Sequence, residues 1–470
     1  MPTEKSLKIL LWLVAIGFFM QTLDSTIVNT ALPAMAASLG ESPLRMQSVV
    51  IAYSLTMAVL IPASGWLADR FGTRQVFFVA ILLFVAGSIF CAASKSLNML
   101  VAARVIQGAG GAMLLPVGRL AVLRNFPRER FLQAISFIAI PGLVGPLIGP
   151  TLGGWLVEAA SWHWIFLVNV PVGVIGGIAT LAYMPDDRNP AVRRFDVTGY
   201  LLLSFGMAAI SLSLNGLSDR GLQHASVLVL LVFGLASITA YWLHATRRPD
   251  PLFSPALFKI HTFTVGLLGN LFSRIGSGAM PFLIPLLLQL SLGYSPAQAG
   301  MMMLPVAGAA MLSKRPVTLL ITRFGYRNVL VSNTLLVGLT IADMALMSAS
   351  QPLWLHVLQL AIFGAVNSMQ FTAMNTITLK DLESGGASSG NSLFSMVQML
   401  AMSLGVTVAG AMLGTFSRLF GHDSGADSLP AFHATFVCVG LITAASAGIF
   451  WQLSPDVKAG VRKSESVDIG

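Results

Sequence analysis

Residues 65–76 read GWLADRFGTRQV and place an Asp and two Arg directly after a long apolar run. The second half of this stretch returns at residues 323–329 as RFGYRNV, about 253 residues later. When the same offset is applied to the first five apolar runs of the chain, it leads to five later apolar runs within a few residues. An offset shared by so many segments predicts an internal repeat, in which a unit of several helices occurs twice.

The composition indicates that lipid is the solvent of this chain. Hydrophobic residues make up 55% of its 470 residues and charged residues only 10%, whereas a soluble domain carries roughly 25% charged residues. The mean hydropathy is +0.78. The apolar runs are continuous and about 20 residues or longer, as in membrane-spanning helices and unlike alternating barrel strands. We predict an all-α integral membrane protein in contact with the lipid bilayer, whose first apolar run is kept as a helix and is not cleaved as a signal.

About 14 apolar runs are long enough to be transmembrane helices. They cover residues 9–33, 46–66, 76–94, 99–122, 131–157, 164–184, 197–216, 225–245, 263–290, 298–320, 329–349, 355–378, 389–415 and 431–452. The two runs that flank residues 215–226 could instead form one re-entrant segment. With fourteen spans, about 22 of the 28 Lys and Arg fall on the side of the termini, against about 4 on the other side. This asymmetry predicts that both termini are cytoplasmic.

Charged, Pro-bearing breaks at residues 184–196 and 245–261 divide the chain. They predict a six-helix bundle in residues 1–190, two inserted helices in 191–250 and a second six-helix bundle in 251–455. Residues 456–470 are polar and are expected to form a cytoplasmic tail. The only two cysteines, Cys91 and Cys438, fall inside apolar runs and predict neither a disulfide nor a metal site.

Four motifs follow one another along the first half of the chain. They are LDSTIVNTALP at 23–33, GWLADRFGTRQ at 65–75, RVIQGAGGA at 104–112 and GLVGPLIGPTLGG at 142–154. In this order they resemble the signatures of the major facilitator superfamily and, within it, of the fourteen-helix drug:proton antiporters, and the resemblance covers nearly the whole chain. It implies two pseudo-symmetric six-helix bundles with two inserted helices. It also implies a multidrug efflux transporter that exchanges protons for small molecules across a bacterial inner membrane, without a cofactor.

The loop motif predicts a conformational latch. Its residues are Gly65, Asp69, Arg70, Gly72 and Arg74. We expect Gly65 to let its helix approach a neighbour closely, and Gly72 to permit the tight turn into the next helix. Asp69 can pair with a nearby Arg and accept from a helix N-terminus, which makes a contact that forms in one conformation and opens in another. The second copy has Thr322 where the first has Asp69, so we expect the latch in the first half only. The alternative is an anchor of positive charge that only fixes the topology.

Asp24 is the strongest candidate for proton coupling. It lies about fifteen residues into the first span and therefore well inside the hydrocarbon layer. A charge there is costly unless it faces a cavity, pairs or takes up a proton. The resemblance also matches Asp24 to the acidic residue of the family motif. The alternative is a structural Asp that bonds to the helix backbone or to Thr26 and holds two helices together.

Arg104 is the second candidate for proton coupling. The resemblance implies that it acts on the coupling carboxylate electrostatically, and Gln107 lies on the same helix face. Alternatively, Arg104 snorkels to the outer surface. Arg274 lies in the middle of the ninth span, and the repeat offset aligns it with Gln21. We therefore expect Asp24 and Arg274 on opposite walls of one polar pocket. The alternative is a buried Arg274 that bonds to helix-end carbonyls.

The candidate lining of a substrate cavity is a set of polar residues within the spans. They are Gln21, Asn270, Arg274, Asn367 and Gln370. Met-rich runs at 301–303 and 396–402 could add an adaptable apolar surface, although such residues are often plain core. We assign no role to Asp343 and expect it at the rim or in packing.

The fifth span carries a glycine stripe with interleaved prolines. Its residues are Gly145, Pro146, Gly149 and Gly153. Glycines four residues apart let another helix pack closely, and prolines bend the helix by removing backbone donors. We expect this helix at the bundle interface, where it would seal one side of the cavity. The likeness of this motif to the antiporter signature favours export over uptake.

No Walker-type phosphate loop, no spaced His and Cys metal set and no sizeable soluble domain is present in the sequence. We therefore predict a secondary transporter and not an enzyme, with no metal and no nucleic-acid partner. Two other functions stay open. The chain could export a small metabolite or an organic anion, because two Arg lie within its spans. It could also be a transporter-like sensor, although its cytoplasmic segments are short.

Overall fold

The computed structural model describes residues 4–126, 128–186, 188, 194–220, 225–382, 387–420 and 428–455. Within these ranges the chain is helical and contains no strand. The predicted tail at 456–470 lies outside the described residues.

The helices fall into two groups separated by a pair. The first group is α1 (Glu4–Leu39), α2 (Gln47–Phe71), α3 (Thr73–Ala92), α4 (Leu97–Asn125), α5 (Arg128–Ala159), α6 (Trp164–Leu167) and α7 (Asn169–Tyr183). The pair is α8 (Val197–Arg220) and α9 (Ala225–Arg247). The second group is η1 (Pro255–Lys259), α10 (His261–Leu286), η2 (Leu287–Ser291), α11 (Pro296–Met301), α12 (Leu304–Leu312), α13 (Lys314–Asp343), η3 (Met344–Leu346), α14 (Leu353–Lys380), α15 (Ala387–Phe420), α16 (Leu429–Ala445) and α17 (Ala447–Phe450).

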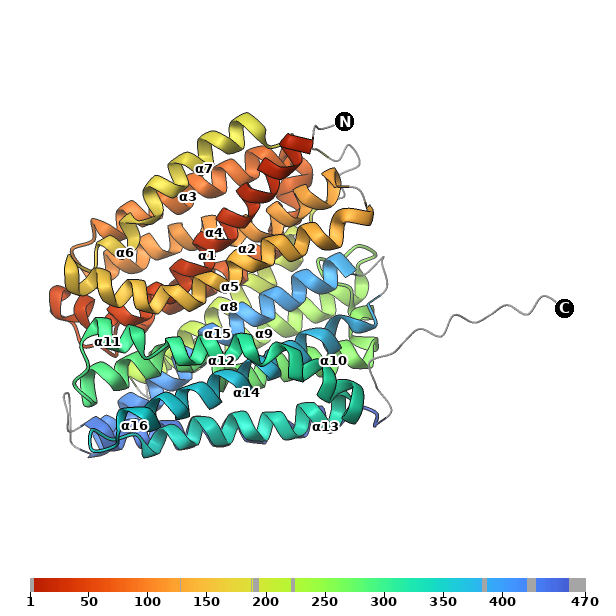
Figure 1. Cartoon of the computed structure of the whole chain (residues 1–470). Helices are drawn as coiled ribbons and strands as arrows, with labels where there is room; N and C mark the ends of the chain where they lie inside the picture. Colours follow the sequence, from red (N-terminus) through yellow and green to blue (C-terminus); the bar gives the residue numbers. More distant parts are fainter. Residues whose placement is uncertain are drawn as a thin grey trace.

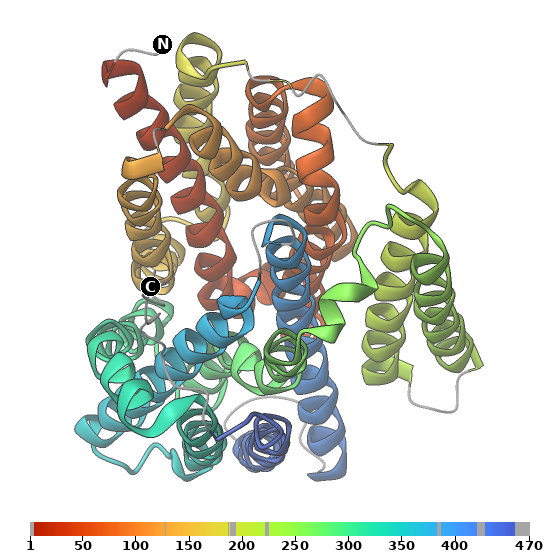
Figure 2. The same cartoon turned by 90° about the vertical axis from the view of Figure 1, so that its right-hand side faces the viewer.

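The predicted spans agree with these helices. Twelve helical segments of the described chain are long and apolar enough to cross a membrane. The 32-residue α5 and the shorter apolar stretch Pro296–Leu312 bring the number to the predicted fourteen. The two segments that flank residues 215–226 are separate spans and not one re-entrant segment, and they stand together as a pair beside the two groups (Figure 2). The chain is a multi-pass membrane protein.

The sequence repeat is also a repeat of backbone geometry. Gly72 has φ 92° and ψ 146°, and Gly325, its counterpart, has φ 79° and ψ 163°. A residue with a Cβ rarely adopts a positive φ, so both turns require glycine. Gly325 breaks α13 into two helices. The first part continues α11 and α12 as the counterpart of α2, and the second part corresponds to α3.

The two groups lie on opposite sides of a common interface (Figure 1). Helix α2 packs on α15, α5 packs on α11, and α1 packs on α10. The repeat offset relates α2 to the stretch from α11 to the first part of α13, and α5 to α15. The first two contacts are therefore one kind of contact formed twice, as expected for two pseudo-symmetric bundles.

The pair α8–α9 covers one of these two interfaces. Helix α8 packs on both α15 and α2. Gln47 Nε2 of α2 donates to Asn215 Oδ1 of α8 over 3.2 Å, and the hydroxyl oxygens of Ser211 in α8 and Ser403 in α15 lie 3.3 Å apart. Helix α8 therefore makes polar contacts with both groups of helices.

Asp196, directly before α8, ties this pair to the segment that follows it. Its carboxylate accepts from the backbone N–H groups of Gly199 and Leu252, each over 3.1 Å, and lies 2.8 Å from His244 Nε2. Burial by itself raises the pKa of Asp196. The hydrogen bonds from His244 and from the two N–H groups outweigh burial, so the pKa lies below its ordinary value.

Candidate functional site

Asp24 of α1 is the centre of a buried polar cluster between α1, α4 and α7. Its side chain is fully shielded from solvent. Oδ2 accepts from Arg104 Nη1 over 2.6 Å, and Oδ1 accepts from Gln107 Nε2 over 2.7 Å and from Asn169 Nδ2 over 3.1 Å. Arg104 balances the charge of this carboxylate, and the three donors satisfy its oxygens. An ionised group inside a membrane protein is tolerated under these conditions.

Arg104 of α4 does not snorkel, because its guanidinium is used inside the bundle. It is 1% exposed, and Nε donates to the carbonyl of Val49 over 3.3 Å. The guanidinium lies 4.1 Å from the centre of the Tyr53 ring, where a cation is attracted to the aromatic face. The structure therefore brings the two proton-coupling candidates together, on elements far apart in sequence.

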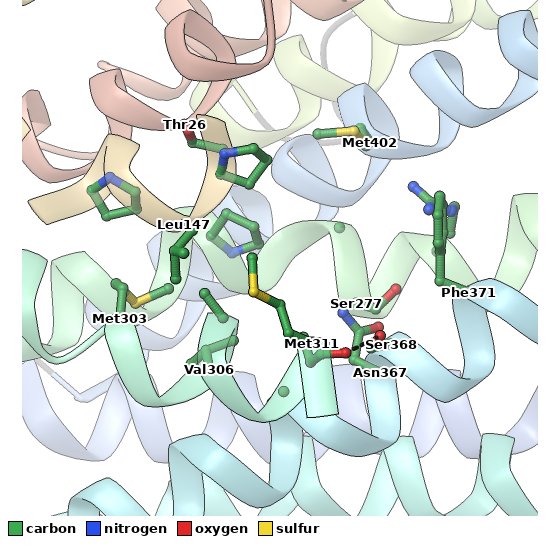
Figure 3. Close-up of a pocket in the computed structure, with 18 of the residues that line it drawn as sticks. Thr26, Leu147, Ser277, Met303, Val306, Met311, Asn367, Ser368, Phe371 and Met402 are labelled. Atoms are coloured by element: carbon green, nitrogen blue, oxygen red, sulfur yellow. Dashed lines mark hydrogen bonds between the residues drawn. The ribbon is translucent and has the colours of Figure 1, made fainter. Parts of the chain in front are cut away.

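A cavity of about 480 Å³ lies between the two groups of helices. It is lined from the first group by Thr26 and Asn29 of α1 and by Pro146, Leu147 and Pro150 of α5. From the second group it is lined by residues that include Arg274, Ser277, Met303, Val306, Met311, Asn367, Ser368, Phe371, Asn375 and Met402, several of which point into it in Figure 3. Methionine and other apolar side chains dominate this surface, and hydroxyl and amide groups are spaced along it.

Arg274 is the one ionisable side chain among the described lining residues. Its guanidinium lies 4.4 Å from the centre of the Phe371 ring, and its Nε has no hydrogen-bond partner among the described residues. No acidic side chain lines the cavity in the described part of the chain. Among the described residues, therefore, no acidic side chain of the lining balances the positive charge that Arg274 brings to the cavity.

Only part of the predicted set of polar residues lines the cavity. Arg274 and Asn367 line the cavity, whereas Gln21, Asn270 and Gln370 do not. Gln370 is three residues after Asn367 and turns toward α13, where it accepts from Asn333 Nδ2 over 2.9 Å. Asn270 bonds to its own helix, through Nδ2 and the carbonyl of Gly266 over 3.1 Å. Gln21 is buried, and its Oε1 makes no hydrogen bond with a described residue.

The expectation that Asp24 and Arg274 share one pocket is wrong for this structure. Asp24 does not line the cavity, because its side chain points toward α4 and α7. Thr26 and Asn29 point into the cavity instead. Side chains two positions apart in a helix point about 200° away from each other, so Asp24 and Thr26 lie on different faces of α1.

Two ion pairs of the loop motif lie within the described part of the chain. Asp69 of α2 pairs with Arg124 of α4, and Arg74 of α3 lies 3.6 Å from Asp186 in the link toward α8. Arg70 stacks near Trp66, 5.9 Å from its ring centre. Each of these contacts stays within the first group or its link, so no described contact of the motif reaches the second group.

The two glycines of this motif differ in their surroundings. Gly72 has a positive φ, and a Cβ on it would lie 2.3 Å from Asp186 Oδ1. A Cβ on Gly65 would meet no described atom within 4 Å. The expected close approach at Gly65 is therefore absent in this conformation, because this face of α2 lies open.

The glycine stripe of α5 packs on α1. A Cβ on Gly145 would lie 2.4 Å from Thr22 Oγ1, one on Gly149 2.2 Å from Thr26 Oγ1, and one on Gly153 2.4 Å from the carbonyl of Ile27. The stripe thus holds two helices of the same group together. Helix α5 itself lies at the interface between the groups, as expected, because it packs on α11 and Pro146 lines the cavity.

The close contact across the interface is made by neighbouring glycines that the sequence analysis missed. A Cβ on Gly154 would lie 2.1 Å from the carbonyl of Pro296, and one on Gly300 would lie 2.3 Å from the carbonyl of Pro150. Glu158 Oε2 accepts from Ser295 Oγ over 2.9 Å and from Ala297 N over 3.2 Å at the same end of α5. Gly154 directly follows the recognised stripe, but only the neighbouring helix reveals its partner.

Asn169 is the other missed residue. It is 2% exposed and begins α7, and its bond to Asp24 joins this helix to the buried cluster. In sequence it is one polar residue in the apolar stretch WHWIFLVNVP, residues 162–171. A buried amide in such a run was the available signal, but its partner on α1 lies 145 residues away.

The sequence profile of the Major Facilitator Superfamily matches residues 14–406. The chain belongs to this superfamily. It is therefore a membrane transporter and not an enzyme.

Relatives within the superfamily match almost the whole chain. One from Serratia proteamaculans, provisionally named multidrug resistance protein MdtD, is 52% identical over 450 residues, which are 95% of this chain and 93% of the relative. Relatives with the same provisional name are 53% identical in Citrobacter koseri, over 95% of this chain and 94% of the relative, and 50% identical in Yersinia pestis, over 96% of both.

Two solved transporter structures share the fold of this chain. A POT family transporter in complex with 5-aminolevulinic acid has a TM-score of 0.69 at 16% identity, over 96% of both chains. A POT family transporter in complex with a thioalcohol-conjugated peptide has a TM-score of 0.70 at 16% identity, also over 96% of both chains. Likeness at this identity supports the fold alone.

Proposed function

We propose that this superfamily member is a proton-coupled exporter of small molecules in a bacterial inner membrane. The observation that carries this proposal is the buried carboxylate of Asp24, held by Arg104, Gln107 and Asn169 in the bundle core. An ionisable residue in this environment is costly to keep and is a functional candidate for that reason. Its partner can release it, because a protonated carboxyl no longer attracts a guanidinium.

Helix α1 is the element that would couple the proton to the substrate. One face of α1 carries Asp24, and another carries Thr26 and Asn29 on the wall of the cavity. Protonation of Asp24 removes the attraction that holds α1 to Arg104 of α4. A small displacement of α1 then alters the cavity wall that the substrate contacts.

The movement we propose is alternating access, with the six-helix bundles of residues 1–190 and 251–455 rocking about the cavity. Contacts between the groups lie toward the ends of α1 and α5 that are far from the chain termini. They include Gln289 Nε2 to the carbonyl of Thr30 over 2.9 Å, and Thr151 Oγ1 to the carbonyl of Gly300 over 3.1 Å. With the termini in the cytoplasm, as the charge asymmetry favours, these contacts close the outer side, and Gly65 lies on the open, inner side.

A multidrug substrate range is favoured by two observations. The relatives at 50–53% identity carry the name multidrug resistance protein in provisional form. The cavity wall includes Met303, Met311 and Met402, and flexible thioether side chains adapt to apolar ligands of different shapes. We therefore propose export of varied, largely apolar small molecules.

Arg274 favours a second candidate, the export of an organic anion or small acidic metabolite. Its guanidinium faces the cavity without a protein counter-ion in the described chain. A substrate carboxylate or phosphate would supply that counter-ion through charge-assisted hydrogen bonds. The Phe371 ring beside it would contact an apolar part of the same molecule.

Transport in inside-out vesicles tests the proposal. Energised vesicles that contain the protein should take up substrate and release lumenal protons, and Asp24→Asn should abolish the coupling while substrate still binds. A panel of cationic dyes and organic anions then distinguishes the two substrate classes. Full proton-driven uptake by Asp24→Asn would contradict the coupling role, and uptake driven by ATP would contradict the transport class.

A further inference from the structure

Asn169 occupies a particular position beside the proton-coupling candidate. It is the first residue of α7, directly after the break that follows α6, and its side chain is 2% exposed. Its Nδ2 donates to Asp24 Oδ1 over 3.1 Å, the longest of the three bonds to that carboxylate. An amide group carries both donors and an acceptor, so it can serve either form of a carboxyl.

The other two partners of Asp24 are not free to change their roles. Arg104 has donors only. Gln107 is fully engaged, because Oε1 accepts from Arg104 Nη1 over 2.7 Å while Nε2 donates to Asp24 and, over 2.9 Å, to Ser88 Oγ. When Asp24 takes up a proton, its new O–H needs an acceptor, and neither partner offers one without breaking a strong bond.

The remaining titratable groups of the cluster in the described chain make no hydrogen bond with Asp24 in this structure. Tyr53 of α2 places its ring on the guanidinium of Arg104, and its hydroxyl makes no hydrogen bond with a described residue. The thiol of Cys91 of α3 lies 3.7 Å from Gln107 Oε1. Together with Arg104, these are the titratable or charged groups that face Asp24 from the helices packed around it in the described chain.

We propose that Asn169 is a positioning residue that serves Asp24 in both protonation states. Its amide donates to the carboxylate and, after a half-turn about the terminal side-chain bond, accepts from the protonated carboxyl. This inference rests on the proposed role of Asp24 in proton coupling. It links the start of α7 to proton uptake, because the same side chain begins that helix and bonds to α1.

Infrared pH titration of the full-length protein in nanodiscs tests this inference independently of transport. The C=O stretch of a protonated carboxyl is assigned to Asp24 as the band that Asp24→Asn removes. Asn169→Leu removes one hydrogen bond from each form of Asp24, and the bond to the charged form is the stronger one, so the midpoint of this band should move to higher pH. The band itself should move to higher wavenumber, because the O–H has lost its acceptor.

Asn169→Ser keeps a donor and an acceptor and should stay close to wild type in both readouts. Asn169→Ala removes the same amide with less bulk and replaces Asn169→Leu if the latter does not fold. Asn333→Leu is the matched control, since it removes a buried amide that bonds to Gln370 in the second group. A purely structural role for Asn169 would lower stability but leave the band of Asp24 in place.

Two negative results have different meanings. A wild-type titration without any band that Asp24→Asn removes would overturn the proton role of Asp24 and this inference with it. A band that titrates in wild type but keeps its midpoint and wavenumber in Asn169→Leu or Asn169→Ala would overturn the role of Asn169 alone.

Discussion

Arg104 Nη1 donates to Asp24 Oδ2 over 2.6 Å, and neither side chain reaches the surface of the molecule. The pair joins α4 to α1 across the core of the first group. Taking two charges out of water is expensive, and their attraction offsets that cost only while both are present. Under the proposed coupling mechanism, the pair would be bound while Asp24 is charged and released once it is neutral, which is what a proton-driven switch requires.

Removal of one member of this pair should be worse than removal of both. Arg104→Leu leaves a buried carboxylate without its counter-charge, so we expect a loss of about 3–5 kcal/mol in the free energy of unfolding. The double variant Asp24→Asn with Arg104→Leu should recover part of that stability, without recovering transport. Thermal unfolding of the detergent-purified proteins measures the first effect and vesicle uptake the second. Additive losses in the double variant would contradict a direct pairing.

Replacement of Arg274 should separate the two substrate classes. Arg274→Gln removes the positive charge from the cavity, so we expect affinity for organic anions to fall roughly 10- to 100-fold, since a charge-assisted hydrogen bond is worth about 1.5–3 kcal/mol. Affinity for cationic dyes should be unchanged or higher. Phe371→Leu is the companion variant and should weaken both classes modestly. Ligand-dependent shifts in melting temperature measure these affinities. Equal losses for anions and cations in Arg274→Gln would indicate a structural Arg.

A larger side chain should destabilise the protein at Gly153 of α5 but not at Gly65 of α2. Gly153→Val places a Cβ only 2.4 Å from the carbonyl oxygen of Ile27. This clash pushes α5 away from α1. We expect a cost of several kcal/mol and poor expression. A Cβ at Gly65 would have no described atom within 4 Å, so Gly65→Val should fold normally. Comparison of expression level and melting temperature tests this contrast. A Gly65→Val variant that folds but transports slowly would indicate that its helix approaches a neighbour in another conformation.

Asp196 should give the link between α8 and the following segment an acid-sensitive component. Its folded-state pKa lies below the ordinary value, so its contribution is present above the unfolded-state pKa and is lost as the pH falls through the lower, folded-state pKa. The loss is expected below about pH 4. Asp196→Asn should remove this dependence and lower stability at neutral pH. Hydrogen exchange of residues 249–253 against pH measures the effect, and Asp250→Asn is a nearby control.

Much of the fold follows from local features of the sequence. Continuous apolar runs of this length predict helical spans, because a helix satisfies its backbone polar groups within its own segment. The repeated RFG turn predicts two like-oriented halves, and the positive φ of Gly72 and Gly325 gives the reason for glycine in both copies. Asp24 is a candidate because a charge in hydrocarbon is too costly to be incidental, and the family resemblance adds Arg104.

The partners of these residues were decided by tertiary structure alone. The sequence predicts that Asp24 is buried, but only the packing of α1 on α4 and α7 shows that it faces Gln107 and Asn169 and not Arg274. Likewise, a glycine stripe predicts close packing without naming the helix it packs on, which is α1. Composition and spacing report what each segment can bury, whereas the direction of a side chain depends on how helices far apart in sequence are rotated against one another.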